Sequence, residues 1–552
     1  MPLRPQTIAA LDDVFADWDT PCRPGIAAGL VCGSQTVYAR TFGLANVEHN
    51  LPITPSTRFE IGSITKQFTA FATLMLVQEG RLDLNDDVRS YITGLPAYDT
   101  PVRIRHCLYH TTGLSDRMAV LGLAGPTCDY TPDKRVFRTL AALDETMFPA
   151  GTMHSYSNTG YVLLAWIIQK VTGTSLPAFL AERVFDPLGM KGASFPMDPF
   201  AFFPNQAQGY LDGDDGRLYR ATCVSDVWGD GGMLANVDDM TGWLCNLATR
   251  DVGIAALHDQ FFSAGHLDDG QELRYAGGWM IQRYRGLRAF QHGGLAEGFQ
   301  SFVIWLPDEK VGVVVLGNVR PYQPWRLATR AIDALLGDTS TRQPVGERAV
   351  PHPTEDHDHQ DLAGRYVTVT GLSAFVACSG PDLYVDIWLW GRRFEACGDD
   401  VYREPHSGDT ATFHRNSDNA VTHFSMATSD GACVHMHSPI STATKYETAI
   451  VDDATLTGFE GRYENDAVES VYEIVAERGG LTARHKRCHD WLLQPIKPAA
   501  GDTFDGAFAQ DGMWPGIVTF ERRADGEATG FRVRGSGINL LFRRRLPTAK
   551  AR

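Results

Sequence analysis

The sequence lacks any apolar run long enough to cross a membrane. It contains no uninterrupted stretch of about 18 apolar residues, which is near the minimum that a membrane-spanning helix requires. Near the N-terminus, Asp12, Asp13, Asp17 and Asp19 interrupt the chain before the apolar segment of a secretory signal can form. We therefore expect no membrane partner and a cytoplasmic location.

Positive charge is also in deficit. The 552 residues include 50 Lys and Arg against 66 Asp and Glu, which gives a formal net charge of −16. The phosphates of a nucleic acid would be repelled by such a chain, so no nucleic-acid partner is expected. The composition, 43% apolar and 21% charged, is that of an ordinary globular protein.

Paired cysteine motifs are missing as well. Ten cysteines are scattered without CxxC pairs or zinc-like spacing, which favours free thiols over disulfides or a metal site. His352, His357 and His359 lie among acidic residues, but nothing there would fix a ligand geometry, so a solvated segment is the preferred interpretation. We predict no metal and no cofactor.

The composition changes near residue 337. Before it, strand patterns alternate with apolar helical patterns, the latter at 63–79, 159–172 and 323–336. Residues 338–360 are polar, contain proline and lack apolar periodicity, which is typical of a linker. After the linker, helical patterns almost vanish and short apolar runs alternate with Gly, Asp and Asn turns, which indicates an all-β region.

A weak internal repeat divides this all-β region. Residues 362–366 (LAGRY) return as residues 459–463 (FEGRY), with the two glycines 97 positions apart (461 − 364). Because each copy opens a β-rich stretch, two domains are favoured over a chance similarity of five residues. We predict an α+β fold, with one mixed domain at 1–337, a linker at 338–360 and two small antiparallel β-barrels at 361–453 and 454–552.

Ser63 and Lys66 form the first candidate catalytic pair. In the segment 59–68 (FEIGSITKQF) they are one helical turn apart, so a helix that begins at Ser63 would place both on one face. A serine hydroxyl needs a base within hydrogen-bond reach, and a lysine can serve if burial and neighbouring positive charge lower its pKa. The alternative is a serine that only caps a helix.

Tyr156 and Asn158 form the second candidate pair. They lie in the polar segment 151–158 (GTMHSYSN), where alternation places both on one side, just before an apolar helical pattern. A tyrosine between cationic groups can hold a lowered pKa and accept the serine proton, and the Asn158 amide can fix Lys66 or a substrate carbonyl. Taken alone, Tyr-x-Asn is a common loop pattern.

The third candidate is a histidine at the end of a strand pattern. It is His292, followed by Gly293, Gly294 and Leu295. The glycines allow the backbone of a ligand to approach closely. His292 can then support Tyr156 electrostatically or bind substrate, while the amides of Ser63 and Leu295 can form an oxyanion hole. A β-bulge with a surface histidine is the alternative for this motif alone.

Together, these motifs resemble those of the penicillin-recognising serine hydrolases, which include class C β-lactamases, D-alanyl-D-alanine carboxypeptidases, esterases and D-aminopeptidases. Their pattern of Ser-x-x-Lys, Tyr-x-Asn and Lys/His-x-Gly is met by Ser63/Lys66, Tyr156/Asn158 and His292/Gly294. The segments 41–46 (TFGLAN), 185–189 (FDPLG) and 228–232 (WGDGG) fit as well. The resemblance implies a β-lactamase/transpeptidase-like domain, in which an antiparallel sheet is flanked by helices and joined by a helical lobe. It also implies an acyl-enzyme mechanism without a metal, in which Ser63, Lys66, Tyr156 and His292 are catalytic and Asn158, Gly293, Gly294 and Leu295 contact substrate.

The two appended β-barrels resemble those of bacterial D-aminopeptidases. That resemblance implies release of N-terminal D-amino acids from small peptides, amides or esters, and an acidic residue from a loop of the last domain that binds the substrate α-ammonium. Asp511 is the matching candidate, although its loop is shorter than the family pattern and Glu297 stands where those enzymes look basic. A carboxylesterase or β-lactam hydrolase and a non-catalytic binding protein are the alternatives, and a homodimer is left open.

Overall fold

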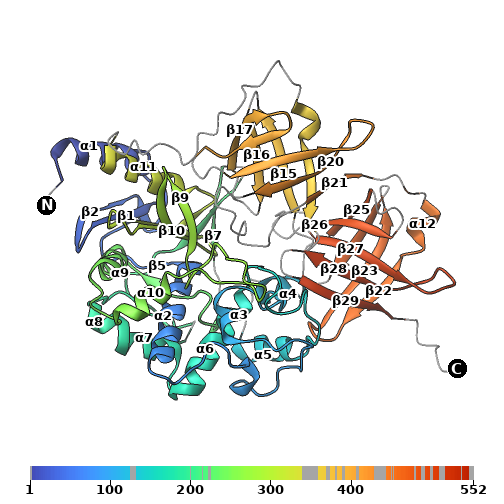
Figure 1. Cartoon of the computed structure of the whole chain (residues 1–552), viewed down its shortest axis with the longest axis horizontal. Coiled ribbons are helices and arrows are strands. Elements are labelled where there is room, and N and C mark those ends of the chain that lie inside the picture. Colours follow the sequence, from blue (N-terminus) through green and yellow to red (C-terminus); the bar gives the residue numbers. More distant parts are fainter. Residues whose placement is uncertain are drawn as a thin grey trace.

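A computed structural model of the chain contains a mixed helix-and-sheet domain followed by two β-barrels (Figure 1). The structure describes residues 3–124 and 132–337, with gaps at 199, 214–215 and 222–224, and residues 359–545, with gaps at 369–372, 380–381, 388–391, 406–408, 428–442, 449–450, 452, 478–479, 486–490, 498–501, 509–515 and 536–537.

A six-stranded antiparallel sheet forms the centre of the first domain, in the order β2-β1-β12-β11-β10-β9. Its members are β1 (Ile26–Cys32), β2 (Gln35–Phe42), β9 (Met280–Tyr284), β10 (Leu287–Ala296), β11 (Phe299–Leu306) and β12 (Val311–Gly317). β1 and β12, from opposite ends of the domain, pair in its middle. The sequences of β1, β12 and the Phe302–Leu306 part of β11 are continuous apolar runs because helices cover both faces of the sheet.

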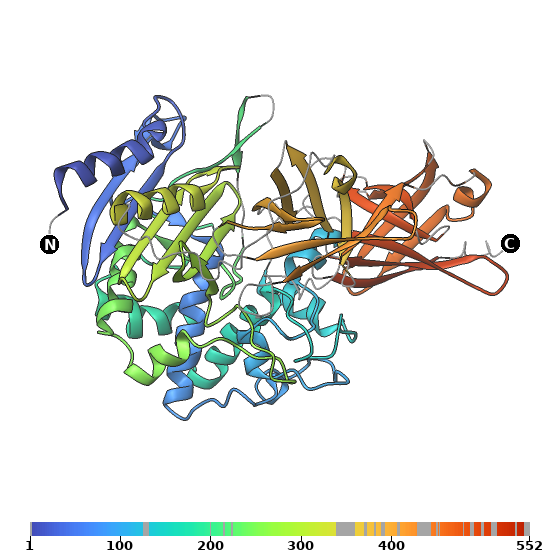
Figure 2. The same cartoon turned by 45° about the horizontal axis from the view of Figure 1, so that its top comes forward.

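Helices form a layer on each face of this sheet (Figure 2). α1 (Pro5–Phe15) and α11 (Pro324–Leu336) pack on one face, where Ile332 and Val313 share an apolar cluster. On the other face, α9 (Val237–Thr249) packs against β1 and β12. Behind it α2 (Thr65–Gln78) packs against α6 (Asn158–Thr172) and α10 (Ala255–Phe261). Every residue of α2 from Thr65 to Leu76 is buried, so Lys66 is held deep inside the domain.

The C-terminal region forms two antiparallel barrels, as predicted. In the described residues each barrel is closed and contains eight strands. The first contains β14 (Gly364–Thr368), β15 (Ser373–Ser379), β16 (Asp382–Ile387), β17 (Arg392–Gly398), β18 (Val401–Arg403), β19 (Thr410–Arg415), β20 (Val421–Ala427) and β21 (Ala443–Thr448). The second contains β22 (Gly461–Asn465), β23 (Ser470–Glu477), β24 (Gly480–His485), β25 (Trp491–Lys497), β26 (Thr503–Phe508), β27 (Gly516–Arg522), β28 (Ala528–Gly535) and β29 (Ile538–Arg544). Pairing of β14 with β21 and of β25 with β26 closes the two barrels and removes their sheet edges.

The sequence repeat corresponds to the same contact at the start of each barrel. The Tyr366 hydroxyl donates to the Leu362 carbonyl at 2.7 Å, and the Tyr463 hydroxyl donates to the Phe459 carbonyl at 2.8 Å. Each tyrosine thus ties the first strand of its barrel to the turn before it. The domain boundaries at 337, 360 and 453 stay predictions, and most of the predicted linker lies outside the described residues.

The helix α4 (Arg117–Ala124) joins the helical lobe to the second barrel (Figure 1). Ala119, Val120 and Leu123 belong to the apolar core of that barrel. The Leu123 carbonyl accepts hydrogen bonds from the Ser470 and Tyr472 hydroxyls, both at 2.9 Å. α4 therefore ends inside the second barrel.

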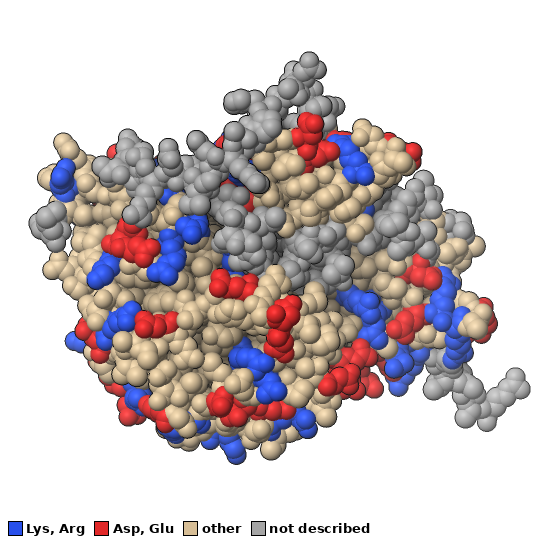
Figure 3. Space-filling view, in the orientation of Figure 1, with Lys and Arg blue, Asp and Glu red and all other residues tan. Residues whose placement is uncertain are grey.

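Acidic and basic side chains are interspersed over the face of the molecule in Figure 3. In the described part of the chain, no single helix is long and apolar enough to span a membrane. The segments Asn158–Thr172 and Leu176–Leu188 reach that length and apolar content only as a pair bent by 74°. Most of the Asn158–Thr172 helix is buried in the core of its own domain.

Candidate active site

Ser63 lies in η2 (Gly62–Ile64), the 3-10 turn that leads from β5 (Phe59–Glu60) into α2. Lys66 follows one turn later and is completely buried. Its Nζ lies 3.0 Å from Ser63 Oγ. The structure thus brings the first predicted pair into hydrogen-bond contact.

The Lys66 amine has two further oxygen partners. Its Nζ donates to Asn158 Oδ1 at 2.8 Å and to the Asp230 backbone carbonyl at 2.7 Å. Both oxygens are acceptors only, so they engage two N–H bonds of a neutral amine and leave its lone pair for the Ser63 hydroxyl proton. Burial lowers the pKa of Lys66 to about 7, against the opposing effect of the Asp230 and Asp116 carboxylates. A neutral amine is therefore accessible near pH 7.

Tyr156 lies against the same pair. Its phenol shares a hydrogen bond with the Ser63 side chain, and Lys66 Nζ lies 4.9 Å from the centre of its ring. Burial raises the pKa of Tyr156 well above its usual value. The predicted lowering of this pKa is wrong, because burial is the largest effect on the phenol and it raises the pKa. Of the neighbours expected to be cations, His292 is neutral and Lys66 is only partly protonated near pH 7. The phenol keeps its proton in the resting site.

His292 is buried on β10 next to Tyr275. Its Nδ1 lies 2.7 Å from the Gly293 carbonyl, which can only accept, so we assign the proton to Nδ1. Nε2 then accepts from the Tyr275 hydroxyl at 3.2 Å. Burial, followed by the proximity of Lys66, lowers the pKa of His292 to about 3. A neutral His292 cannot support Tyr156 as a cation, and the centres of their rings are 6.0 Å apart.

Two glycines allow β10 to lie directly against the turn that carries Ser63. A Cβ atom on Gly294 would lie 1.9 Å from the Ile61 carbonyl oxygen, and one on Gly62 would lie 2.5 Å from the Leu295 amide nitrogen. Any side chain at either position would separate the two backbones. This contact therefore holds together the segments that supply the Ser63 and Leu295 amides, the two predicted donors of an oxyanion hole.

Gly294→Ala is expected to lower kcat/KM by about 10²- to 10³-fold, the effect of losing one oxyanion donor, because the added methyl group displaces Leu295 from the Ser63 turn. Steady-state kinetics would measure this loss. Gly242→Ala in α9 is the matched control, since its Cβ would meet nothing closer than 3.9 Å. Equal activity of the Gly294→Ala variant and the wild type would show that the close contact is not needed.

Sequence reasoning missed a buried ion pair behind Lys66. The Arg117 guanidinium donates to Asp230 Oδ2 through Nε at 2.8 Å and Nη2 at 2.7 Å, and both residues are at least nine-tenths buried. The Asp116 carboxylate accepts a hydrogen bond from the backbone N–H of Asn158 at 2.5 Å. It also caps the start of α4 by accepting from the backbone N–H of Met118. The segment 228–232 gave a signal for Asp230. Asp116 and Arg117 carry no local motif, because they reach the site only through the fold.

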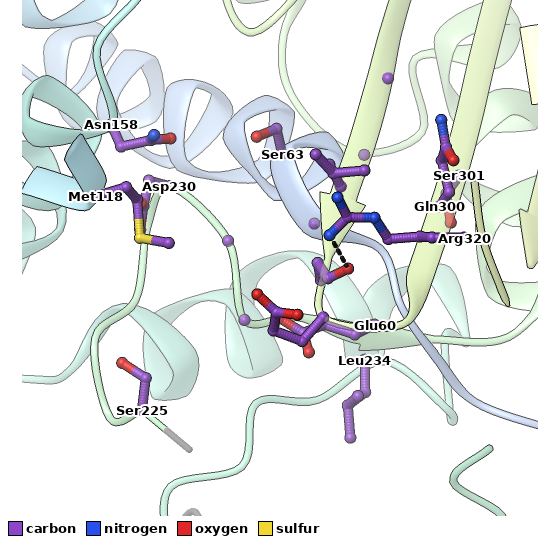
Figure 4. A pocket seen from close by; sticks show the side chains of 18 of the residues that line it. Glu60, Ser63, Met118, Asn158, Ser225, Asp230, Leu234, Gln300, Ser301 and Arg320 are labelled. Carbon is purple, nitrogen blue, oxygen red and sulfur yellow. Dashed lines mark hydrogen bonds between the residues drawn. The ribbon is translucent and has the colours of Figure 1, made fainter. Parts of the chain in front are cut away.

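Ser63 opens into a cavity of about 340 Å³, a size that suits a small molecule (Figure 4). Tyr156, Asn158, His292 and residues 293–295 line it too, so the structure gathers every described residue that was predicted for the site. Asp511 lies outside the described residues. In the part of the chain that is described, no group of three or more His, Cys, Asp or Glu side chains could hold a metal ion.

A family model described as beta-lactamase matches residues 11–337, which is more than half of the chain and includes all three motifs. The chain belongs to the beta-lactamase family. This assignment agrees with the geometry, since the family segment contains the central sheet, the Ser63 turn and the cavity.

This beta-lactamase family member is similar to several individual proteins. It is 32% identical to a D-aminopeptidase of Gluconobacter oxydans (strain 621H) over 301 residues, and 30% identical to a D-aminopeptidase of Brucella canis over 302 residues. Each match covers 53% of this chain and 56% of the relative, so the chain spans about half the length of the curated relatives it matches. The solved octameric penicillin-binding protein homologue from Pyrococcus abyssi shares the fold, with a TM-score of 0.53 and 22% identity over 87% of this chain and 98% of the other.

Proposed function

We propose that this beta-lactamase family member is a serine hydrolase that acts through an acyl-enzyme on Ser63. We further propose that it releases N-terminal D-amino acids from small peptides, amides or esters. The observation that carries the proposal is the Lys66 amine, buried and held 3.0 Å from Ser63 Oγ by two carbonyl-type acceptors. A hydroxyl with such a base beside it, open to a cavity, is poised for nucleophilic attack.

In the proposed reaction, neutral Lys66 takes the proton of Ser63 as its Oγ attacks the substrate carbonyl. The Ser63 and Leu295 amides stabilise the resulting oxyanion. Protonated Tyr156 gives its proton to the departing nitrogen or oxygen, and the Lys66 ammonium restores the proton to the phenolate. Water then attacks the Ser63 ester by the reverse order of proton transfers. His292 orients Tyr275 as a neutral acceptor and carries no charge in these steps.

The choice of substrate rests on the two relatives named D-aminopeptidase and on the small cavity. Asp511 as the ligand of the α-ammonium stays a prediction from family resemblance. We also propose a cytoplasmic location and expect neither a nucleic-acid nor a membrane partner. Whether the protein forms a homodimer stays open. Esterase or β-lactam hydrolase activity is the second candidate, because the same serine and base would serve it.

A substrate screen tests the proposal. Hydrolysis of D-alanine p-nitroanilide, L-alanine p-nitroanilide, p-nitrophenyl acetate and a cephalosporin would be compared by kcat/KM. We expect the D-amino amide to be turned over faster than its L-enantiomer and faster than the cephalosporin. Faster turnover of the neutral ester or of the cephalosporin would select the second candidate, and no turnover of any substrate would contradict both.

Activity is expected to depend on the protonation of Lys66. Below pH 7 the amine gains a proton and can no longer accept one from Ser63, whereas above pH 7 it is neutral, because its pKa is lowered to about 7. The acylation rate with a neutral ester should therefore rise tenfold per pH unit below pH 7 and level off above it. A stopped-flow burst over pH 5–9 measures this. A rate that is still rising tenfold per unit between pH 8 and pH 9 would indicate an ordinary lysine pKa.

A further inference from the structure

Two carboxylates outside the proposed acyl-transfer steps line the cavity beside Ser63. Glu60 ends β5, three residues before Ser63, and Figure 4 shows it at the same open space as Ser63. Glu297 follows the end of β10, two residues beyond Leu295. Within the described part of the chain, neither carboxylate has a hydrogen-bond or ion-pair partner. The described residues therefore leave the charge of both carboxylates without a partner.

A third carboxylate adds to this negative potential. Asp230 is 4% exposed and lines the same cavity. Its Oδ2 is paired with Arg117, but its Oδ1 is buried without a hydrogen-bond partner. A buried acceptor with no donor is costly, and the unpartnered oxygen adds to the negative potential at the wall of the cavity.

The cations near the cavity do not neutralise Glu60. Arg117 is engaged by Asp230, Lys66 is bound by the Asn158 and Asp230 oxygens, and Arg320 donates to the Ala296 carbonyl at 3.4 Å. Arg135 also lines the cavity. Burial and, after it, the negative charges of Glu297 and Asp230 together raise the pKa of Glu60 to about 7. The pKa of Glu60 is thus raised by burial and by neighbouring negative charge. Both effects oppose ionisation of Glu60, and both become smaller when a cation binds beside it.

We propose that Glu60 and Glu297, with Asp230 behind them, form the subsite that binds the α-ammonium of the substrate. The inference rests on the proposed function. It assigns binding of the α-ammonium to residues of the first domain, whereas the family resemblance assigns it to Asp511. The substrate carbonyl oxygen would lie at the Leu295 amide. Glu297 follows two residues later, in the turn after β10, and lines the same cavity as Ser63. An ammonium one carbon from that carbonyl is a compact group with three donors, which matches these acceptors.

The test compares two substrates that differ only in the amine. D-Alanine p-nitroanilide carries the ammonium, and propionic acid p-nitroanilide has the same acyl chain without it. The double variant Glu60→Gln/Glu297→Gln should lose about 10- to 100-fold in kcat/KM for the first substrate, the effect of removing charge-assisted hydrogen bonds, and less than about threefold for the second. Glu182→Gln, at an exposed position of η4 (Ala181–Phe185), is the control and should change neither value.

Each outcome decides the inference. If the double variant lost equal kcat/KM on both substrates, or lost none on D-alanine p-nitroanilide, the subsite would be overturned. The proposed serine hydrolase activity would not be affected. Loss of amine selectivity in Asp511→Asn and its retention in the double variant would return the role to Asp511. If neither substrate acylated Ser63 in the wild type, the proposed function and the subsite would be overturned together.

A measurement on the wild type needs no variant. The ratio of kcat/KM for the two anilides cancels the titration of Lys66, which affects both. The groups that face Glu60 are Glu297 and Asp230, with Arg117 and Arg320 beyond them. The ratio should rise with pH as Glu60 ionises near pH 7, then fall above about pH 8 as the substrate ammonium loses its proton. A ratio that is constant from pH 5 to 9 would overturn the inference.

Discussion

Ser63→Ala is expected to lower kcat for D-alanine p-nitroanilide by about 10⁵- to 10⁶-fold, the loss that follows removal of a serine nucleophile. Without Oγ no acyl-enzyme can form, and Lys66 has no hydroxyl to deprotonate. Because Ser63 lies in a turn at the cavity, the fold should survive, which circular dichroism would check.

Ser157→Ala is the matched control for this experiment. Ser157 is buried one residue before α6, and its Oγ has no hydrogen-bond partner, so its loss should leave both stability and kcat nearly unchanged. If Ser63→Ala kept more than about a hundredth of the wild-type rate, a different nucleophile or an activated water would have to carry the reaction.

Lys66→Met is expected to lower kcat by about 10³- to 10⁴-fold, since the hydroxyl loses the base that lies 3.0 Å away. Methionine has a similar length and no charge, so it suits a position that is completely buried. The rate of acylation by p-nitrophenyl acetate would be measured.

Lys66→Arg separates proton transfer from charge. Arginine keeps a cation and its hydrogen-bond donors but cannot give up its proton near pH 7. If Lys66 acts as the base, Lys66→Arg should be as inactive as Lys66→Met. Substantial activity in Lys66→Arg would show that a positive charge, and not a base, is what Ser63 requires.

The parts of the fold that were predicted from sequence are those encoded locally. The helices at 159–172 and 323–336 carry their own apolar periods and end at turn residues, and the structure contains them within a few residues. The repeat LAGRY/FEGRY encodes one tyrosine contact in each barrel, which is why five residues sufficed to indicate two domains.

What sequence reasoning missed depends on residues that meet only after folding. The pKa of Tyr156 was predicted with the wrong sign, because spacing says nothing about how completely a phenol and its neighbours are buried. The Arg117–Asp230 pair joins positions 113 residues apart. Glu60 carries no signal of its own within the Ser-x-x-Lys segment, because Glu297, which lines the same cavity, is more than 200 positions away in the sequence.

The link between the second barrel and the site was also beyond sequence reasoning. Leu123 at the end of α4 is bound by Ser470 and Tyr472, while Arg117 at its start holds the segment whose carbonyl accepts from Lys66. These contacts join residues about 350 positions apart in the sequence. The second barrel thus packs on the helix that supports the base.

The most direct test of the account is to trap the acyl-enzyme. Wild-type protein would be mixed with a D-alanine ester, quenched in acid within the first turnovers, digested and mapped by mass spectrometry. The account predicts one adduct, with the mass of an alanyl group, on Ser63. Rapid turnover without any adduct, or an adduct on another residue, would contradict it.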